Sequence, residues 1–152
     1  MNAAVPPAAK LHLVVGYDGS PPAVRALDGA VRLLSGRTGQ IVVMYVGHLP
    51  AADAMSPDAL AEMEQTFSEI ARDLRVQAEE QLRGREDRWQ FEWRQGEIAR
   101  ELLAEAERLG EADPGATVAI VVGSSSHATH RVIGSVAVSL SRHSPVPLMI
   151  VP

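Results

Sequence analysis

The sequence predicts an α/β fold: one doubly wound domain with a five-stranded parallel sheet. Three nearly continuous apolar runs, at residues 11–16, 41–46 and 117–122, have the composition of central parallel strands, whose two faces are both covered by helices. Segments with apolar residues at helical spacing separate these runs, so strands and helices alternate along the chain. The chain has 152 residues and no internal repeat, which suits a single domain.

Two helices are predicted in the first half of the chain. The first is expected to begin at an N-cap, Ser20, with two prolines in its first turn, and to end before Gly36. A longer helix is expected from Ser56 to near Gly84. Its apolar stripe consists of Leu60, Met63, Phe67, Ile70, Leu74 and Ala78.

The second half of the chain continues the alternation. Residues 88–94 alternate strictly between polar and aromatic, which favours a strand with one solvated face at an edge of the sheet. A third helix is expected to end at Leu109, with Gly110 as its C-cap. A fourth helix over 135–143 and a last strand over 146–151 complete the order β-α-β-α-β-α-β-α-β.

The composition excludes several classes of function. A net charge of −5 argues against a broad nucleic-acid interface. No stretch approaches the roughly 18 apolar residues of a membrane span. The absence of cysteine excludes disulfides and cysteine nucleophiles and fits a cytoplasmic protein. Residues 1–9 lack the basic start and apolar run of a signal peptide, and we expect a flexible tail ahead of a domain at 10–152.

Two strand exits are expected to flank a ligand crevice, because ligands of such sheets lie beyond the carboxyl ends of the strands. Asp18 follows the first strand, and the segment from Gly123 to Ser135 is rich in small residues and leads into the fourth helix. Small residues let backbone N–H groups approach a phosphate, and a helix N-terminus adds partial positive charge. The pattern therefore predicts a nucleotide or another phosphate ligand.

Each of these segments also has a simpler interpretation, and the one for the turn from Gly123 to Ser126 is an ordinary loop between a strand and a helix. Asp18 could accept hydrogen bonds from a nucleoside or help to hold a metal, or it could only form an Asp-Gly turn. His127, His130 and Arg131 are the cationic candidates for phosphate contacts. Zinc would require a third protein ligand that no spacing places. The chain has neither a Gly-x-Ser-x-Gly elbow nor a Walker motif, which argues against a dedicated hydrolase.

A set of short motifs in a fixed order resembles the universal stress protein family, of the bacterial ATP-binding type. The motifs are Leu-Val-Val-Gly-Tyr-Asp-Gly-Ser at 13–20, Met-Tyr-Val at 44–46, Gly-Glu-Ile at 96–98, and the glycine-containing segment from 122 to 136 followed by Pro-Leu-Met-Ile-Val at 147–151. The resemblance implies a flavodoxin-like, adenine nucleotide alpha hydrolase-like sheet with strand order 3-2-1-4-5. It also implies a site for ATP, with or without Mg²⁺, or for another adenine nucleotide.

The resemblance also implies roles for individual residues. Asp18 matches the residue that meets the nucleoside, and Val46 matches the apolar residue against adenine. The phosphate pattern is Gly-x-x-Gly followed nine residues later by Gly-Ser, but here Ser126 replaces the second glycine and the spacing is shorter. The expected nucleotide-binding residues are Tyr17, Asp18, Val46, Val122, Gly123, Ser125, Ser126, His127, Arg131, Gly134, Ser135 and Val136.

The expected function is therefore that of a cytoplasmic stress-response regulator that binds an adenine nucleotide. Two alternatives stay open: a protein of the same fold that acts through protein partners without nucleotide, and a slow nucleotide hydrolase. No catalytic residue and no metal site are predicted. The last strand, 146–151, contains no charged residue and is expected at a sheet edge, which favours a homodimer through this strand over a cover from the chain's own N-terminal tail.

Overall fold

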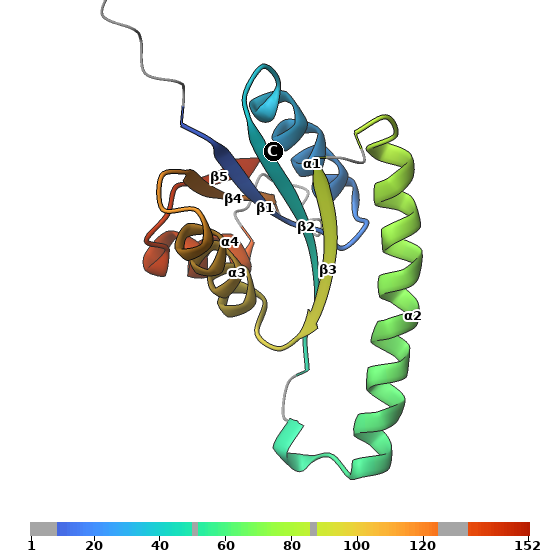
Figure 1. Cartoon of the computed structure of the whole chain (residues 1–152). Helices are drawn as coiled ribbons and strands as arrows, with labels where there is room; N and C mark the ends of the chain where they lie inside the picture. The colour runs from blue at the N-terminus through green and yellow to red at the C-terminus, as the bar shows by residue number, and fades with distance from the viewer. Residues whose placement is uncertain (1–8, 50–51, 86–87, 125–133) are drawn as a thin grey trace, which may run out of the picture.

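A computed structural model describes residues 9–49, 52–85, 88–124 and 134–152. Five strands form one sheet with the order β3-β2-β1-β4-β5, and all neighbouring strands are parallel (Figure 1). The strands are β1 (Leu11–Gly16), β2 (Gly39–Gly47), β3 (Trp89–Gln95), β4 (Thr117–Gly123) and β5 (Leu148–Val151). This arrangement confirms the predicted fold class, the strand order and the edge position of the aromatic strand.

Four α-helices cover the two faces of the sheet (Figure 1). They are α1 (Pro21–Leu34), α2 (Pro57–Gln81), α3 (Ile98–Ala112) and α4 (Ser135–His143), and a short 3₁₀ turn, η1 (Ala52–Ala54), precedes α2. The predicted serine caps of the first two helices are confirmed: Ser20 Oγ accepts from Ala23 N at 3.4 Å, and Ser56 Oγ accepts from Ala59 N at 3.2 Å. None of the helices in the described ranges is long and apolar enough to cross a membrane.

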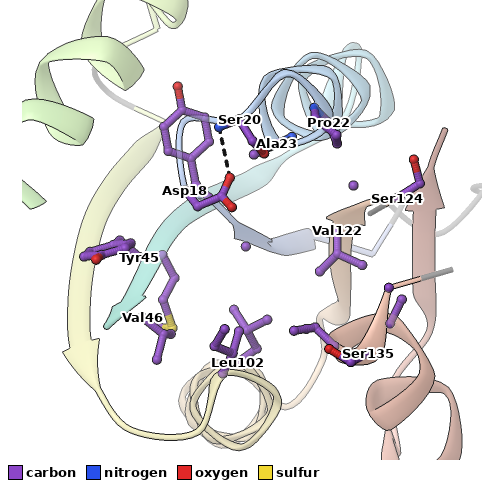
Figure 2. Close-up of a pocket in the computed structure, with 18 residues that line it drawn as sticks. Asp18, Ser20, Pro22, Ala23, Tyr45, Val46, Leu102, Val122, Ser124 and Ser135 are labelled. Atoms are coloured by element: carbon purple, nitrogen blue, oxygen red, sulfur yellow. Dashed lines mark hydrogen bonds between the residues drawn. The ribbon is translucent and has the colours of Figure 1, made fainter. Parts of the chain in front are cut away.

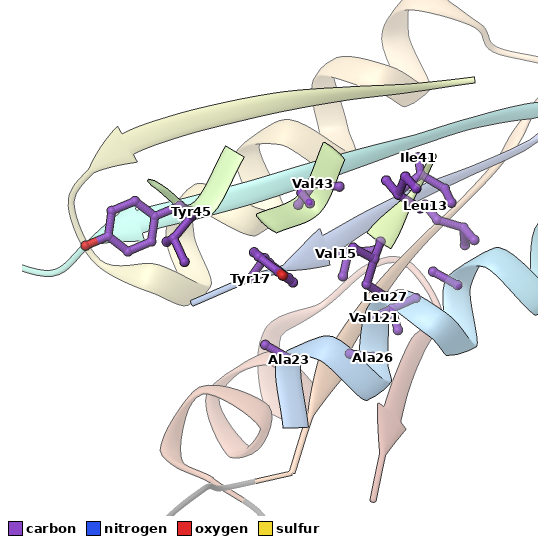
Figure 3. Packing of buried hydrophobic residues seen from close by; sticks show 14 of the residues in the cluster. Leu13, Val15, Tyr17, Ala23, Ala26, Leu27, Ile41, Val43, Tyr45 and Val121 are labelled. Carbon is purple, nitrogen blue, oxygen red and sulfur yellow. The ribbon is translucent and has the colours of Figure 1, made fainter. Parts of the chain in front are cut away.

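The core consists of two layers, one on each face of the sheet. Leu13 and Val15 of β1 pack with Leu27 of α1 on the face covered by α1 and α2 (Figure 3). Val14 lies between them in sequence and packs on the opposite face, under α3 and α4. Successive side chains of a strand point to opposite faces, so a central strand needs apolar residues at every position. The continuous apolar runs in the sequence have this physical origin.

The apolar stripe of α2 is narrower than predicted. Phe67, Ala71, Leu74 and Ala78 are buried, but Ile70 is 38% exposed. The helix packs over β2 and the edge strand β3, so the sheet beneath it is too narrow to bury a wider apolar stripe. In addition, the first part of α2 extends past the end of the sheet (Figure 1).

Two predicted boundaries were wrong. Gly110 does not cap α3: the helix continues to Ala112, and Asp113 is the C-cap, with its N–H donating to Leu109 O. The last strand begins at Leu148 rather than at residue 146. Ser144 causes the delay, because its hydroxyl donates to Val146 O at 2.7 Å and accepts from Val146 N at 3.3 Å, which holds the chain in a turn.

Candidate functional site

A pocket of about 220 Å³ lies at the carboxyl ends of the central strands. Its walls come from the exits of β1, β2 and β4 and from the first turns of α1, α3 and α4 (Figure 2). The chain order in the sheet reverses between β1 and β4, and the crevice at such a reversal is the usual ligand position in open α/β sheets.

The structure brings the described candidate residues together at this pocket. They are Tyr17, Asp18, Val46, Val122, Gly123, Gly134, Ser135 and Val136, and all of them line it. The remaining candidates, Ser125, Ser126, His127 and Arg131, lie outside the described residues, as does His130. Residues from four separate parts of the sequence thus meet in one place.

Asp18 lies in the tight turn between β1 and α1. One carboxylate oxygen, Oδ1, accepts from Ser20 N at 3.0 Å, which fixes the side chain over the start of α1. Gly19 between them has φ of +76°, a conformation that side-chain-bearing residues rarely adopt. The turn therefore holds a carboxylate at the rim of the pocket, and within the described ranges its Oδ2 has no hydrogen-bond partner.

Apolar side chains form the wall opposite Asp18. Val46 at the end of β2, Leu102 of α3 and Val122 at the end of β4 surround the hollow (Figure 2). Met44 and Ile98 complete this wall. A flat apolar group fits here, because the wall gives van der Waals contact and no hydrogen-bonding group of its own.

The N-terminus of α4 closes the pocket on the side of β4. Its N-cap is Gly134, no side chain in the described part of the chain caps it, and its first turn holds no acidic residue. The first N–H groups of a helix have no partner within the helix, and with the helix dipole they favour an anion. Ser135 adds a hydroxyl at the same place.

Gly123 has a packing role as well as a place in the pocket. A Cβ at this position would lie 2.5 Å from the carbonyl carbon of Pro22, so only glycine lets the end of β4 approach the start of α1. Gly134, in contrast, has φ of −65°, which any residue can adopt. Packing against Pro22 therefore requires glycine at 123, whereas the backbone conformation at 134 does not require it.

The sequence matches the profile of the universal stress protein family over residues 11–152. The chain belongs to the universal stress protein family. No curated protein sequence matches it significantly.

Solved structures of universal stress proteins share the fold at low sequence identity. UspA from Lactobacillus plantarum is 19% identical with a TM-score of 0.70, over 95% of this chain and 99% of the other. A universal stress protein in complex with cAMP is 22% identical with a TM-score of 0.63, over 95% and 98%. A family protein from Arabidopsis thaliana with AMP bound is 14% identical with a TM-score of 0.61, over 93% and 90%. At these identities the similarity shows the fold alone.

Two phenols in this universal stress protein are held neutral near the site. Burial, followed by the charges of Asp18 and Asp28, raises the pKa of Tyr17 above its usual 10.0. Burial and then the charge of Asp18 raise the pKa of Tyr45 in the same way. Both hydroxyls therefore stay protonated at neutral pH and can donate a hydrogen bond.

Sequence reasoning missed part of the pocket wall. Met44, Ile98 and Leu102 line the pocket, although their pattern in the sequence indicated only core positions. It also missed the buried carboxylate of Glu105, one turn further along α3 from Leu102. Of the predicted polar candidates, the described ones (Tyr17, Asp18 and Ser135) line the pocket. Apolar residues look the same in a sequence whether they line a pocket or the core. No cluster of three or more metal-ligating side chains occurs among the residues that the structure describes.

Proposed function

We propose that this universal stress protein binds an adenine nucleotide, ATP in particular, in the pocket between β1 and β4. The proposal rests on three features that line the same pocket: the Asp18 carboxylate, the apolar wall around Val46, and the start of α4 at Gly134, which no described side chain caps. The carboxylate suits the ribose hydroxyls, the apolar wall suits the adenine ring, and the helix start suits the phosphates. Family members with cAMP and with AMP bound support the same ligand class.

In this arrangement the adenine lies against Val46 and the ribose hydroxyls donate to Asp18. The phosphates face the first turn of α4, with Ser135 as an additional donor. The pocket volume of about 220 Å³ is below the roughly 300–1,000 Å³ typical of whole-ligand sites, which supports a pocket that takes the nucleoside and leaves the phosphates at its rim.

The residues fit Mg²⁺ only as part of a nucleotide complex. Asp18 is the one carboxylate among the described pocket residues. Mg²⁺ is commonly held by one or two carboxylates together with phosphate oxygens and water. Mg²⁺ would therefore enter with ATP, held mainly by phosphate oxygens and water, because Asp18 is assigned to the ribose hydroxyls.

The wider role that we propose is stress-response regulation in the cytoplasm, by a homodimer joined through β5. The position of β5 at the sheet edge and its apolar composition support this interface. Slow ATP hydrolysis is the alternative activity, and action through protein partners without nucleotide is the alternative mechanism.

Calorimetric titration of the purified protein with ATP, AMP, adenosine and GTP tests the proposal. We expect saturable binding of ATP and AMP, weaker binding of adenosine and no comparable binding of GTP. A ligand at about 100 times its Kd adds about 2.7 kcal/mol to the free energy of unfolding, so ATP should also raise the melting temperature. A folded protein that shows no heat and no thermal shift with millimolar ATP would falsify the nucleotide proposal.

A further inference from the structure

Helix α2 contributes no side chain to the described pocket wall, yet it contacts both turns that form the nucleoside half of the site. A Cβ at Gly19 would lie 2.7 Å from Leu74 Cδ2 and 2.9 Å from Gln77 Oε1. A Cβ at Gly47 would lie 2.6 Å from the ring of Phe67. The turn that carries Asp18 and the strand end that follows Val46 therefore both rest directly on α2.

Gln81, the last residue of α2, joins three elements around the same turn. Its Oε1 accepts from the Tyr17 hydroxyl at 3.4 Å. Its Nε2 donates to Val24 O at 2.8 Å and to Asp28 Oδ1 at 2.8 Å, both in α1. One amide thus holds the residue before Asp18 and the helix after it.

Tyr17 has little freedom to move in this arrangement. Its side chain is 3% exposed and belongs to the core layer beneath α1 and α2 (Figure 3). Because Asp18 is the next residue, the direction of its carboxylate depends on where the Tyr17 backbone lies. A contact that fixes Tyr17 against α2 and α1 therefore also fixes Asp18.

We infer that Gln81 is a positioning residue of the nucleotide site: it holds the Tyr17–Asp18 segment in the conformation that receives the nucleoside. This inference rests on the proposed function. Coupling between two sites is reciprocal, so if the Gln81 contacts favour nucleotide binding, bound nucleotide stabilises the end of α2 by the same factor. The predicted consequence is a helix that responds to a ligand it does not touch.

The test compares Gln81→Leu with Gln65→Leu, a matched change on the exposed part of the same helix, where Gln65 Nε2 donates to Glu69 Oε1 at 3.2 Å. Calorimetry with adenosine, AMP and ATP should give an about fivefold weaker affinity for all three in Gln81→Leu and no change in Gln65→Leu. An equal loss for all three ligands locates the effect at the nucleoside rather than at the phosphates.

Tyr17→Phe supplies a milder variant that removes only the hydroxyl. We expect it to weaken adenosine binding in the same direction, and we expect the double variant with Gln81→Leu to lose no more than Gln81→Leu alone. A lower melting temperature by itself does not support the inference, because any loss of packing would cause it.

Hydrogen exchange distinguishes a positioning role of Gln81 from a purely structural one, because a purely structural role would not make exchange in α2 depend on bound AMP. AMP should slow amide exchange at residues 74–82 of α2 in the parent protein, and this slowing should disappear in Gln81→Leu. The inference is overturned if the parent binds AMP and Gln81→Leu binds it with unchanged affinity, or if AMP leaves exchange in α2 unchanged. If the parent binds no adenine nucleotide at all, the proposed function itself is wrong and the inference is overturned with it.

Discussion

The carboxylate of Glu105 is completely buried and accepts a hydrogen bond from Arg94 at 2.5 Å, which ties α3 to the edge strand β3. Arg108 Nε donates to the same carboxylate at 3.0 Å. Burial alone would raise the pKa of Glu105, but the hydrogen bonds and charges of Arg108 and Arg94 outweigh it and lower that pKa below 4.5. The ion pairs therefore hold in place the helix that supplies Leu102 to the pocket.

We predict that Glu105→Gln destabilises the protein at neutral pH by about 2 kcal/mol, because the two arginines lose a charged partner. The pKa of Glu105 is lower in the folded protein than in the unfolded chain. The ionised carboxylate therefore contributes its full stabilisation above the unfolded-state pKa, and this stabilisation is lost as the pH falls through the folded-state pKa. The difference in unfolding free energy between parent and variant should therefore be constant from about pH 6 to 8 and shrink below about pH 4.

Urea unfolding across this pH range measures the effect, and Glu107→Gln provides the control. Glu107 is an exposed residue on the same helix, and its substitution should change the unfolding free energy by less than about 0.5 kcal/mol. A Glu105→Gln variant as stable as the parent at neutral pH would show that the two arginines find other partners.

The difference between what could and could not be predicted has a physical cause. Apolar runs indicated the central strands because both of their faces are buried, and Ser20 and Ser56 indicated helix starts because the capping contact is local in sequence. Glu105 could not be identified in this way. A glutamate between helical core positions normally indicates a solvated face, and its partner Arg94 comes from another element that only the fold brings near.

The same reasoning applies to the site. Asp18 and Ser135 line the pocket, and their place could be predicted because each lies at a strand exit or helix start, a position that the alternation of elements already defines. Gln81 was not found, because its three contacts reach residues 53 to 64 positions away in the sequence. Local patterns thus predict which residues lie at the carboxyl edge of the sheet, while the side chains that support those residues depend on tertiary contacts.

Replacement of Gly134 by valine should abolish ATP binding while the protein stays folded. The φ of −65° at Gly134 suits valine, so the backbone need not change, but the branched side chain would lie at the start of α4, where we place the phosphates. Calorimetry should show loss of ATP and AMP binding and a smaller effect on adenosine. The control is Gly115→Val, where a Cβ meets nothing within 4 Å. Unchanged ATP binding in Gly134→Val would place the phosphates elsewhere.

Replacement of Asp18 by alanine should weaken the nucleoside contacts. We expect an about tenfold loss of affinity for adenosine and for ATP, because the carboxylate is the charged acceptor at the pocket rim and charge-assisted hydrogen bonds are the stronger ones. Binding of inorganic phosphate should change less. Asp73→Ala, an exposed position on α2, is the matched control and should bind all ligands like the parent. An equal loss for phosphate and adenosine would mean that Asp18 supports the whole site rather than the nucleoside.

The dimer proposal can be tested through the backbone of β5 itself. Pro147 O accepts from Ile120 N and Val151 O accepts from Ser124 N, so the odd-numbered residues of β5 point their backbone groups toward β4. In a strand these groups alternate between the two edges, so the N–H groups of Leu148 and Ile150 point outward. The missing N–H of Pro147 therefore faces β4 and leaves the outer edge intact.

Leu148→Pro should convert the dimer into a monomer, because it removes an outward donor at the first residue of the strand, where proline is tolerated. Leu148→Ala removes the same side chain but keeps the N–H, and it should stay dimeric. Sedimentation at tens of micromolar measures the state of each, and far-UV circular dichroism of the two variants should be the same if only the interface changes. The melting temperature of Leu148→Pro should be the lower one, because a monomer lacks the stabilisation that dimerisation gives. A monomeric parent would show that β5 does not pair with a second copy. A dimer in both variants would place the interface on another surface.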